Sequence, residues 1–327
     1  MVPVARRGPR AGVTNMAPVI SPVEVRSVLL ATDLSQASAK PLRHALAIAR
    51  YFGAKFYLAH VVSSVGLTMA GPDAIDGAEQ AVCRDAARLE DDLVRRGALA
   101  GVQHEVIISR GEIWAELETI IRQENIDLVV LGTHARHGIG KLLLGSVAEQ
   151  IFRQAACMVV TVGPSSYQEL RVGSSHASRT FIFATDFGDG SLHALPIAVS
   201  SANRFGAKLV LLNVVPVNSI TLPEPPSWCT AADLLSARDK ARGIALRRLE
   251  ELTQGTILDV NPEFCAAFES GHSISETILY ASRTFRADAI IMGLHRSKHI
   301  GAASHMPWAT AYEVVCNAQC PVLTIRQ

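Results

Sequence analysis

The sequence predicts an α/β protein made of two tandem Rossmann-like domains, each a five-stranded, mostly parallel sheet with helices on both faces. The length of 327 residues suggests two domains, because one domain usually takes roughly 150 residues. The same motifs also recur in the same order in the two halves of the chain. Within each half, short apolar runs alternate with amphipathic ones, which is typical of a sheet whose parallel strands are joined by crossover helices.

The repeat is clearest at the end of the first predicted strand, where LLATDL in one half becomes IFATDF in the other. The recurring segments are 29–34 with 182–187, 54–62 with 207–215, and 127–132 with 288–293. The offset grows from 153 to 161 residues between the first and last of these pairs. Such drift is expected of a duplicated domain that has gained small insertions in its surface loops.

The repeat divides the chain into four parts. Residues 1–24 contain three arginines and several Pro and Gly but no apolar core of a secretory signal, so we expect a flexible N-terminal tail. The first domain spans 25–163 and the second spans 178–327. Between them, 164–177 is rich in Gly and Ser and is predicted to be a linker.

The elements of the first domain follow from periodicity. Short β-branched runs predict strands at 26–31, 55–62, 103–108, 127–131 and 158–162. Apolar residues at three- and four-residue spacing predict crossover helices at 36–52 and 113–124. Ligands of such sheets bind beyond the carboxyl ends of the strands, so we expect a site just after the first, second and fourth strands.

The composition favours a soluble cytoplasmic protein that binds small ligands or other proteins. With 31 basic and 30 acidic residues, the net charge of +1 gives no reason to expect nucleic acid or an anionic membrane as a partner. No apolar run reaches the roughly 20 residues of a membrane-spanning helix. The six cysteines form no Cys-x-x-Cys pair and are interpreted as reduced thiols, with Cys157 and Cys320 packed before closing strands.

The most specific motif follows the fourth strand, where residues 132–146 read GTHARHGIGKLLLGS. This segment resembles the nucleotide loop of the universal stress protein family, whose ATP-binding members carry Gly-x2-Gly-x9-Gly-Ser or Gly-Thr. Gly132, Gly145 and Ser146 match, and Ala135 stands at the second glycine. A Walker loop is excluded because Gly140-Lys141 is followed by Leu142, and a dinucleotide fingerprint is excluded because its third glycine is missing.

The resemblance implies that the first domain binds ATP, with Mg²⁺ shared among the phosphates. The family's nucleotide contacts carry over to these residues: Ala31, Thr32, Asp33, Val61, Val62, Gly132, Thr133, His134, Arg136, Gly138, Gly145, Ser146 and Val147. Glycines let backbone N–H groups approach an anion, and a helix N-terminus favours phosphate.

Several of these residues have a second interpretation. Asp33 either accepts hydrogen bonds from a nucleoside or caps the helix that begins near Ser35. Val61 needs no ligand to explain it, since valine is at home in a buried strand. Ser146 is expected to cap the following helix. Ala135 weakens the loop if that position requires a positive φ.

No catalytic constellation stands out in the first domain. His134 and His137 lack a third metal ligand or a positioned nucleophile, so no metal site is expected. Glu112, Glu116 and Glu118 are interpreted as a solvated helix face.

The second domain departs from the motif. Its loop begins at Gly293, and the Gly-Ser pair is absent, so we expect no ATP binding by this route. Asp186 is retained, which favours a helix cap over a site for a different nucleotide. The proline-rich stretch 216–228 is expected to be a long surface loop.

Three functions stay open. The first is a stress-response protein whose first domain binds ATP and acts as a nucleotide-dependent regulatory or sensor module. The second is a slow ATPase, for which no residue that positions water can be named. The third is a scaffold that binds no nucleotide. The resemblance further implies intramolecular pairing of the two domains through their last strands and a possible homodimer.

Overall fold

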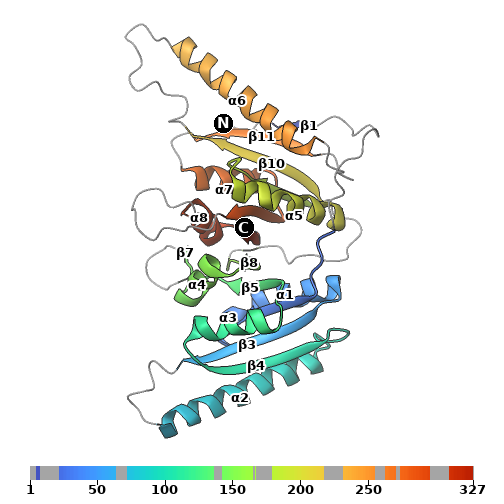
Figure 1. The fold of residues 1–327 in the computed structure, drawn as a ribbon, viewed down its shortest axis with the longest axis vertical. Coiled ribbons are helices and arrows are strands. Elements are labelled where there is room, and N and C mark those ends of the chain that lie inside the picture. Colours follow the sequence, from blue (N-terminus) through green and yellow to red (C-terminus); the bar gives the residue numbers. More distant parts are fainter. Residues whose placement is uncertain are drawn as a thin grey trace. The chain divides into compact units, whose positions relative to one another are not determined.

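The computed structural model describes residues 5–7, 22–63, 72–135, 142–164, 166, 179–216, 231–254, 262–269, 273–294 and 309–326. The chain forms two compact units, one built mainly from Glu24–Ser175 and the other mainly from His176–Ala318. Each unit is an α/β domain with a mostly parallel sheet (Figure 1). The predicted fold class is therefore confirmed.

The first domain begins with strand β2, which is apolar after its first residue, Ser27. Its elements are β2 (Ser27–Ala31), the 3-10 turn η1 (Gln36–Ser38), α1 (Ala39–Phe52), β3 (Lys55–Ser63), α2 (Pro72–Arg95), β4 (His104–Gly111), α3 (Ile113–Gln123), β5 (Leu128–Gly132), β6 (His134–Ala135), β7 (Leu142–Leu143), α4 (Ser146–Gln154) and β8 (Met158–Val162). The strand order is β8-β5-β2-β3-β4, and neighbouring strands in this order are parallel.

This order reverses direction at β2. The chain moves outward from β2 to β3 and β4, then returns to β5 on the other side of β2. Because crossover connections are right-handed, the helices before and after the reversal cover opposite faces of the sheet. The carboxyl ends of β2 and β5 therefore lie side by side at the switch point, where such folds bind ligands.

The second domain repeats this arrangement. Its elements are β9 (Thr180–Ala184), α5 (Asp189–Phe205), β10 (Lys208–Val215), α6 (Ala231–Thr253), β11 (Glu263–Phe268), α7 (Ile274–Thr284), β12 (Ala289–Leu294), α8 (Ala309–Asn317) and β13 (Val322–Arg326). The order is β13-β12-β9-β10-β11, with one further strand, β1 (Ala5–Arg7), antiparallel to β11. Strand β1 was not predicted, and its three residues lie in the segment expected to be a tail.

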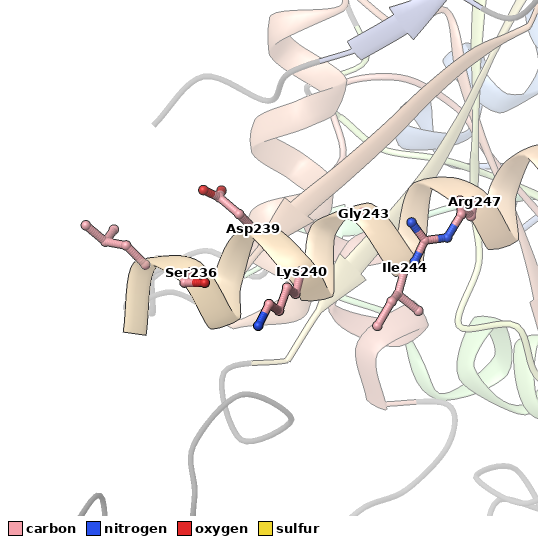
Figure 2. Close-up of a pocket in the computed structure, with 7 residues that line it drawn as sticks. Ser236, Asp239, Lys240, Gly243, Ile244 and Arg247 are labelled. Atoms are coloured by element: carbon pink, nitrogen blue, oxygen red, sulfur yellow. The ribbon is translucent and has the colours of Figure 1, made fainter. Parts of the chain in front are cut away.

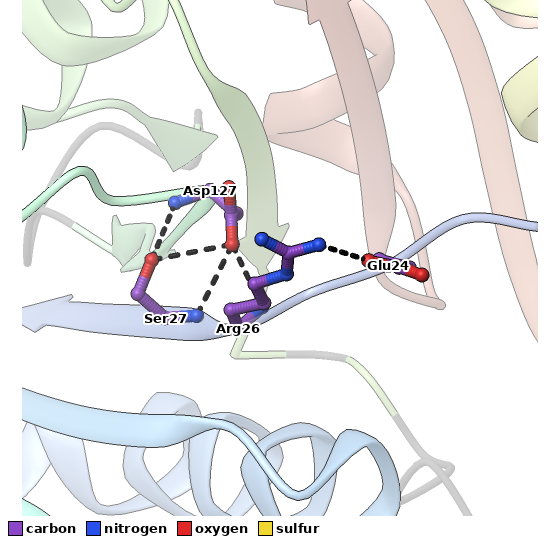
Figure 3. A network of polar contacts seen from close by, with 4 residues as sticks. All are labelled: Glu24, Arg26, Ser27 and Asp127. Atoms are coloured by element: carbon purple, nitrogen blue, oxygen red, sulfur yellow. Dashed lines mark hydrogen bonds and ion pairs between the residues drawn. The ribbon is translucent and has the colours of Figure 1, made fainter.

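A repeated aspartate fixes the amino ends of the central strands. In the first domain, Asp127 Oδ2 accepts hydrogen bonds from the backbone N–H of Arg26 at 2.7 Å and of Ser27 at 3.2 Å (Figure 3). In the second domain, Asp288 Oδ2 accepts one from the N–H of Thr180 at 2.8 Å. These aspartates therefore hold the first and fourth strands in register, at the end of the sheet opposite to the ligand edge.

Candidate functional site

The first part of the candidate site is the turn that follows β2. Thr32 N–H donates to the carbonyl of Ala59 at 3.0 Å, and Thr32 Oγ1 accepts from the N–H of Leu34 at 2.9 Å. Leu34 has a φ of 59°, a left-handed conformation that is costly for a branched side chain. His60 Nδ1 lies 2.8 Å from the carbonyl oxygen of Thr32. The turn after Ala31 is thus held by its own chain, with its backbone in a fixed shape.

Asp33 lies on this turn and is exposed. Its Oδ1 accepts hydrogen bonds from the N–H of Ser35 and from the Ser38 hydroxyl, both at 3.0 Å. The capping interpretation of Asp33 thus has a geometric basis, since the carboxylate orders the approach to η1 and α1. Its exposure leaves room for a ligand contact as well.

Val61 and Val62 lie inside β3, which ends one residue later at Ser63. Both are buried, with 8% and 5% of their surface exposed. Any contact with a ligand there would be made by the backbone at the strand end.

Gly132 ends β5 beside the turn after β2. A Cβ at Gly132 would lie 2.8 Å from Pro41 Cγ of α1, so the glycine allows the helix to pack closely on the strand. Thr133 is buried, its N–H donates to the Val162 carbonyl at 3.1 Å, and its Oγ1 has no hydrogen-bond partner within the described ranges. Beyond it, the side chain of His134 is not described, and Arg136 and Gly138 lie outside the described residues.

The start of α4 differs from the expectation that Ser146 caps this helix. The N-cap is Gly145, with φ −62° and ψ 159°, and it makes no side-chain cap hydrogen bond. Ser146 is instead the first helical residue and is exposed. The expected cap is therefore wrong, because glycine takes the extended N-cap conformation and has no side chain to close the first turn. Open N–H groups in that turn are the donors that bind anions at helix N-termini.

An open hollow of about 450 Å³ begins at this helix end and extends along α4 as far as Gln154. Its described lining includes Ser146 and Val147 of α4 and comes from the end of β3, the start of α3 and α4: Ser63, Glu112, Ile113, Ser146, Val147, Glu149, Gln150, Arg153 and Gln154. The other predicted residues do not line it.

The two glutamates on the acidic side of this hollow, Glu112 and Glu149, were not among the predicted site residues. Glu112, expected on a solvated helix face, is the N-cap of α3 and accepts a hydrogen bond from the N–H of Ala115 at 2.6 Å. Glu149 is partly neutralised by Arg153 at 3.3 Å. The position of Glu112 directly after a strand, before a run of helix formers, is the signal that could have identified it.

In the second domain a side-chain hydrogen bond links the two helices that correspond to α3 and α4. Ser275 at the start of α7 donates a hydrogen bond to Glu313 Oε2 of α8, so the counterparts of α3 and α4 are joined directly. The turn after β9 keeps the geometry of the first domain: Asp186 Oδ1 accepts from the N–H of Gly188 at 2.9 Å and from the Ser191 hydroxyl at 2.5 Å. The Arg248 guanidinium lies 4.1 Å from the centre of the Phe187 ring on that turn.

A further hollow lies along α6 and contains none of the predicted residues. Its described lining is confined to this helix: Leu235, Ser236, Asp239, Lys240, Gly243, Ile244 and Arg247. Figure 2 shows Asp239 on one side of the helix and Lys240 and Ile244 on the other. A face of a single helix does not enclose a small molecule, so the hollow at α4 is the better candidate.

Two of the described cysteines, Cys157 and Cys265, have unreactive thiols. Burial raises the pKa of Cys157 to about 11 and that of Cys265 to about 12. Such thiols are protonated at neutral pH and are poor nucleophiles.

Together these features define an α/β protein with two Rossmann-like domains, of which the first has an open hollow at the carboxyl edge of its sheet. The model of the universal stress protein family matches residues 24–163 and 178–326. The chain belongs to this family, as a tandem two-domain member.

Sequence relatives match the length of one domain. The chain is 27% identical over 143 residues to the universal stress protein YxiE of Bacillus subtilis, which covers 41% of this chain and 97% of that protein. It is 30% identical over 148 residues to universal stress protein A homolog 1 of Coxiella burnetii, covering 42% of this chain and 95% of that protein.

The fold match extends over both domains. A universal stress protein from Archaeoglobus fulgidus superposes with a TM-score of 0.65 at 21% identity, covering 93% of this chain and 97% of that one. Within the described part of the chain, no helix is both long and apolar enough to cross a membrane.

Proposed function

We propose that the first domain binds ATP and that the protein acts as a nucleotide-dependent regulatory module. The observation that carries this proposal is the open hollow that begins at the N-terminus of α4, where Ser146 and Val147 line it, and continues along this helix. Gly145 leaves the first-turn N–H groups free of a side-chain cap, which suits a phosphate. Thr32 and Asp33 would then lie on the nucleoside side, at the switch point between β2 and β5.

The substitution at the second glycine of the family loop is compatible with this proposal. Ala135 lies in strand β6 and pairs with Leu142 of β7. Strand residues have negative φ, so the position does not need glycine for its backbone conformation.

The carboxylates of Glu112 and Glu149 line the same hollow and would repel bare phosphates. A divalent cation such as Mg²⁺ would reduce this repulsion when carried by the nucleotide. We therefore propose that the ligand is the metal complex of ATP, with phosphate held by the backbone at Ser146 and Val147.

The test is titration calorimetry with ATP and Mg²⁺ on protein stripped of nucleotide. One site per chain is expected. Gly145→Val should weaken binding at least about tenfold, because a branched side chain would crowd the phosphates. A Cβ at Gly145 meets no heavy atom within 4 Å, so this variant should fold.

The matched control is Gly188→Val, which alters the N-cap glycine of α5 in the second domain. It should leave ATP affinity unchanged. Absence of binding by the native chain would favour the scaffold function, and equal affinity of the Gly145→Val variant would remove the loop from the site. A positive titration would justify an assay for slow hydrolysis.

We further propose a reducing, cytoplasmic setting and pairing of the two domains within the chain. The cysteines that the structure describes, Cys83, Cys157, Cys265, Cys316 and Cys320, are all free thiols. Thiol labelling in intact cells tests the reducing setting. Cleavage of the linker followed by gel filtration tests the pairing of the two domains, which should then elute together.

A further inference from the structure

The outer strand of the second domain, β11, is apolar along nearly its whole length. After Glu263 it reads Phe-Cys-Ala-Ala-Phe, and all of these residues are buried. The outer strand of the first domain, β4, instead carries polar or charged residues at both ends, His104 and Glu105 at one and Ser109 and Arg110 at the other. Charged residues commonly protect the edge of a sheet, whereas an apolar edge strand pairs readily with another segment. The edge of β11 therefore needs a cover.

The cover in this structure is β1, a three-residue strand from the beginning of the chain. It pairs antiparallel with β11, with Arg6 opposite Phe264 (Figure 1). β1 belongs to the same compact unit as the second domain, although the first domain follows it in the chain. A segment that is distant in the sequence thus occupies this edge.

Only alternate residues of β11 direct their backbone groups toward the edge. Val215 at the end of β10 stands opposite Phe268, and its carbonyl accepts a hydrogen bond from the N–H of Glu269 at 3.2 Å. In a parallel pair, the residue directly opposite then points away from its neighbour. The N–H and C=O groups of Phe264, Ala266 and Phe268 therefore lie at the outer edge. Of these three residues, Phe264 alone has a β1 residue opposite it within the described ranges.

The hold of β1 on this edge is weak. Arg6 and Phe264 form a hydrogen-bonded pair with two backbone bonds, while the residues on either side of Arg6 direct theirs away from β11. Two such bonds contribute little net free energy, and ordering three residues costs at least as much. A segment that also bonds to Ala266 and Phe268 would form three such pairs. A longer extended segment should therefore displace β1.

We propose that the edge of β11 is a peptide-binding site, at which an extended segment of a partner protein replaces β1 and pairs antiparallel along the whole strand. β1 shows the orientation that this occupant takes. Backbone hydrogen bonds supply the affinity in such strand addition. The partner is thus defined by its extended conformation and by a length of at least six residues, which matches Glu263–Phe268. β1 then acts as a built-in competitor that sets how much of the edge is open.

The test is fluorescence anisotropy of a labelled eight-residue probe with the full-length chain. The probe has three Thr-Val repeats between two arginines, which favours an extended conformation and keeps it soluble. The native chain should bind it. Arg6→Pro should tighten binding at least about threefold, because proline removes the N–H that donates to the Phe264 carbonyl and so opens the edge. Arg7→Pro is the matched control and should change nothing, because the N–H of Arg7 points away from β11.

Two further measurements identify how and where the probe binds. Methylation of every backbone nitrogen of the probe removes its donors without changing its charge and should abolish binding. Hydrogen exchange should show that the probe protects the amides of Phe264, Ala266 and Phe268 and none along β4. Absence of binding to both the native and the Arg6→Pro chains, equal effects of the two proline variants, or protection of other segments would each overturn the proposal.

A second copy of the chain is the alternative occupant of the opened edge. The Arg6→Pro chain without peptide should have the same oligomeric state as the native chain in sedimentation velocity. A higher oligomer of this variant, together with loss of probe binding, would assign the edge to a second copy and overturn the proposal. None of these measurements needs nucleotide, so their outcome is independent of the proposed ATP site.

Discussion

The two domains make the same turn after their first strands but differ after their fourth. Asp33 and Asp186 hold equivalent turns through the same pattern of backbone and serine contacts. After the fourth strand, the first domain leaves an open hollow at α4, whereas Ser275 and Glu313 join α7 to α8 in the second. The shared turn therefore reflects the shared fold, and among the described residues the two domains differ in the region after the fourth strand.

The equivalent glycines Gly132 and Gly293, which lie at the end of the fourth strand of their domains, also have different surroundings. A Cβ at Gly293 would lie 2.0 Å from the backbone oxygen of Gly190, whereas a Cβ at Gly132 would meet only the Pro41 side chain at 2.8 Å. The first glycine of the loop is thus kept in the second domain by helix packing, and its survival there says nothing about nucleotide.

The largest expected effect comes from Gly293→Ala. The clash is with backbone, so α5 must move away from β12, and we expect a loss of unfolding free energy of about 3 kcal/mol or more. Gly132→Ala meets a ring that can shift and should cost about 1 kcal/mol. Urea unfolding followed by circular dichroism measures both, and equal losses would contradict the packing difference.

The next effect is a pH dependence carried by Cys265 in the second domain. Burial raises the pKa of its thiol from 9.0 to about 12. The unfolded thiol loses its proton first, so this contribution is complete below pH 9 and declines as the pH rises toward the folded pKa. Between pH 9 and 10.5 the unfolding free energy should fall by about 2 kcal/mol from this group.

Cys265→Ala should remove that component, seen as a flatter dependence of the urea midpoint on pH. Cys157→Ala in the first domain is the comparison, because the pKa of Cys157 is raised only to about 11. Its contribution ends about one pH unit earlier, so the slopes of the two variants should be similar up to about pH 10.5 and should differ only at higher pH. Identical slopes for the native chain and the Cys265→Ala variant would refute the assignment.

A smaller effect is expected at two matched helices, α3 and α7. Ser273 and Glu276 form a reciprocal capping box at α7, whereas α3 is capped by one bond from the N–H of Ala115 to Glu112. Ser273→Ala should cost about 1 kcal/mol, because it breaks the box. Glu112→Ala should cost about 0.5 kcal/mol. Thermal unfolding checks the order, and a larger loss at Glu112 would reverse it.

The five strands predicted in the first domain are present because each contains a short apolar run that the sheet buries. The prediction at 55–62 and the observed β3 at Lys55–Ser63 differ by one residue. Strand β1 was not predictable in this way, because three residues gain their conformation from pairing with β11 and not from their own pattern.

The candidate site was predictable only where it follows one motif. Ser146 and Val147 belong to the loop, and both line the hollow. Ser63 and Glu112 come from other strand ends, and only the folded sheet brings them to the same place. The cap at Gly145 was missed because serine is the better capping residue by propensity, while the local backbone places glycine at that position.

The smallest expected effect separates two ion pairs of identical design. Lys208–Glu263 and Lys55–Glu105 have almost the same length, but the glutamate side chain is 15% exposed in the second domain and 47% exposed in the first. Solvent weakens the exposed pair, so Glu105→Gln should leave the urea midpoint of the protein unchanged. Glu263→Gln should lower stability by about 0.5 kcal/mol. Adding 1 M salt should reduce the difference, because surface charges are screened. A larger loss for Glu105→Gln than for Glu263→Gln would contradict the idea that coverage of β11 by β1 makes the Lys208–Glu263 pair the stronger one.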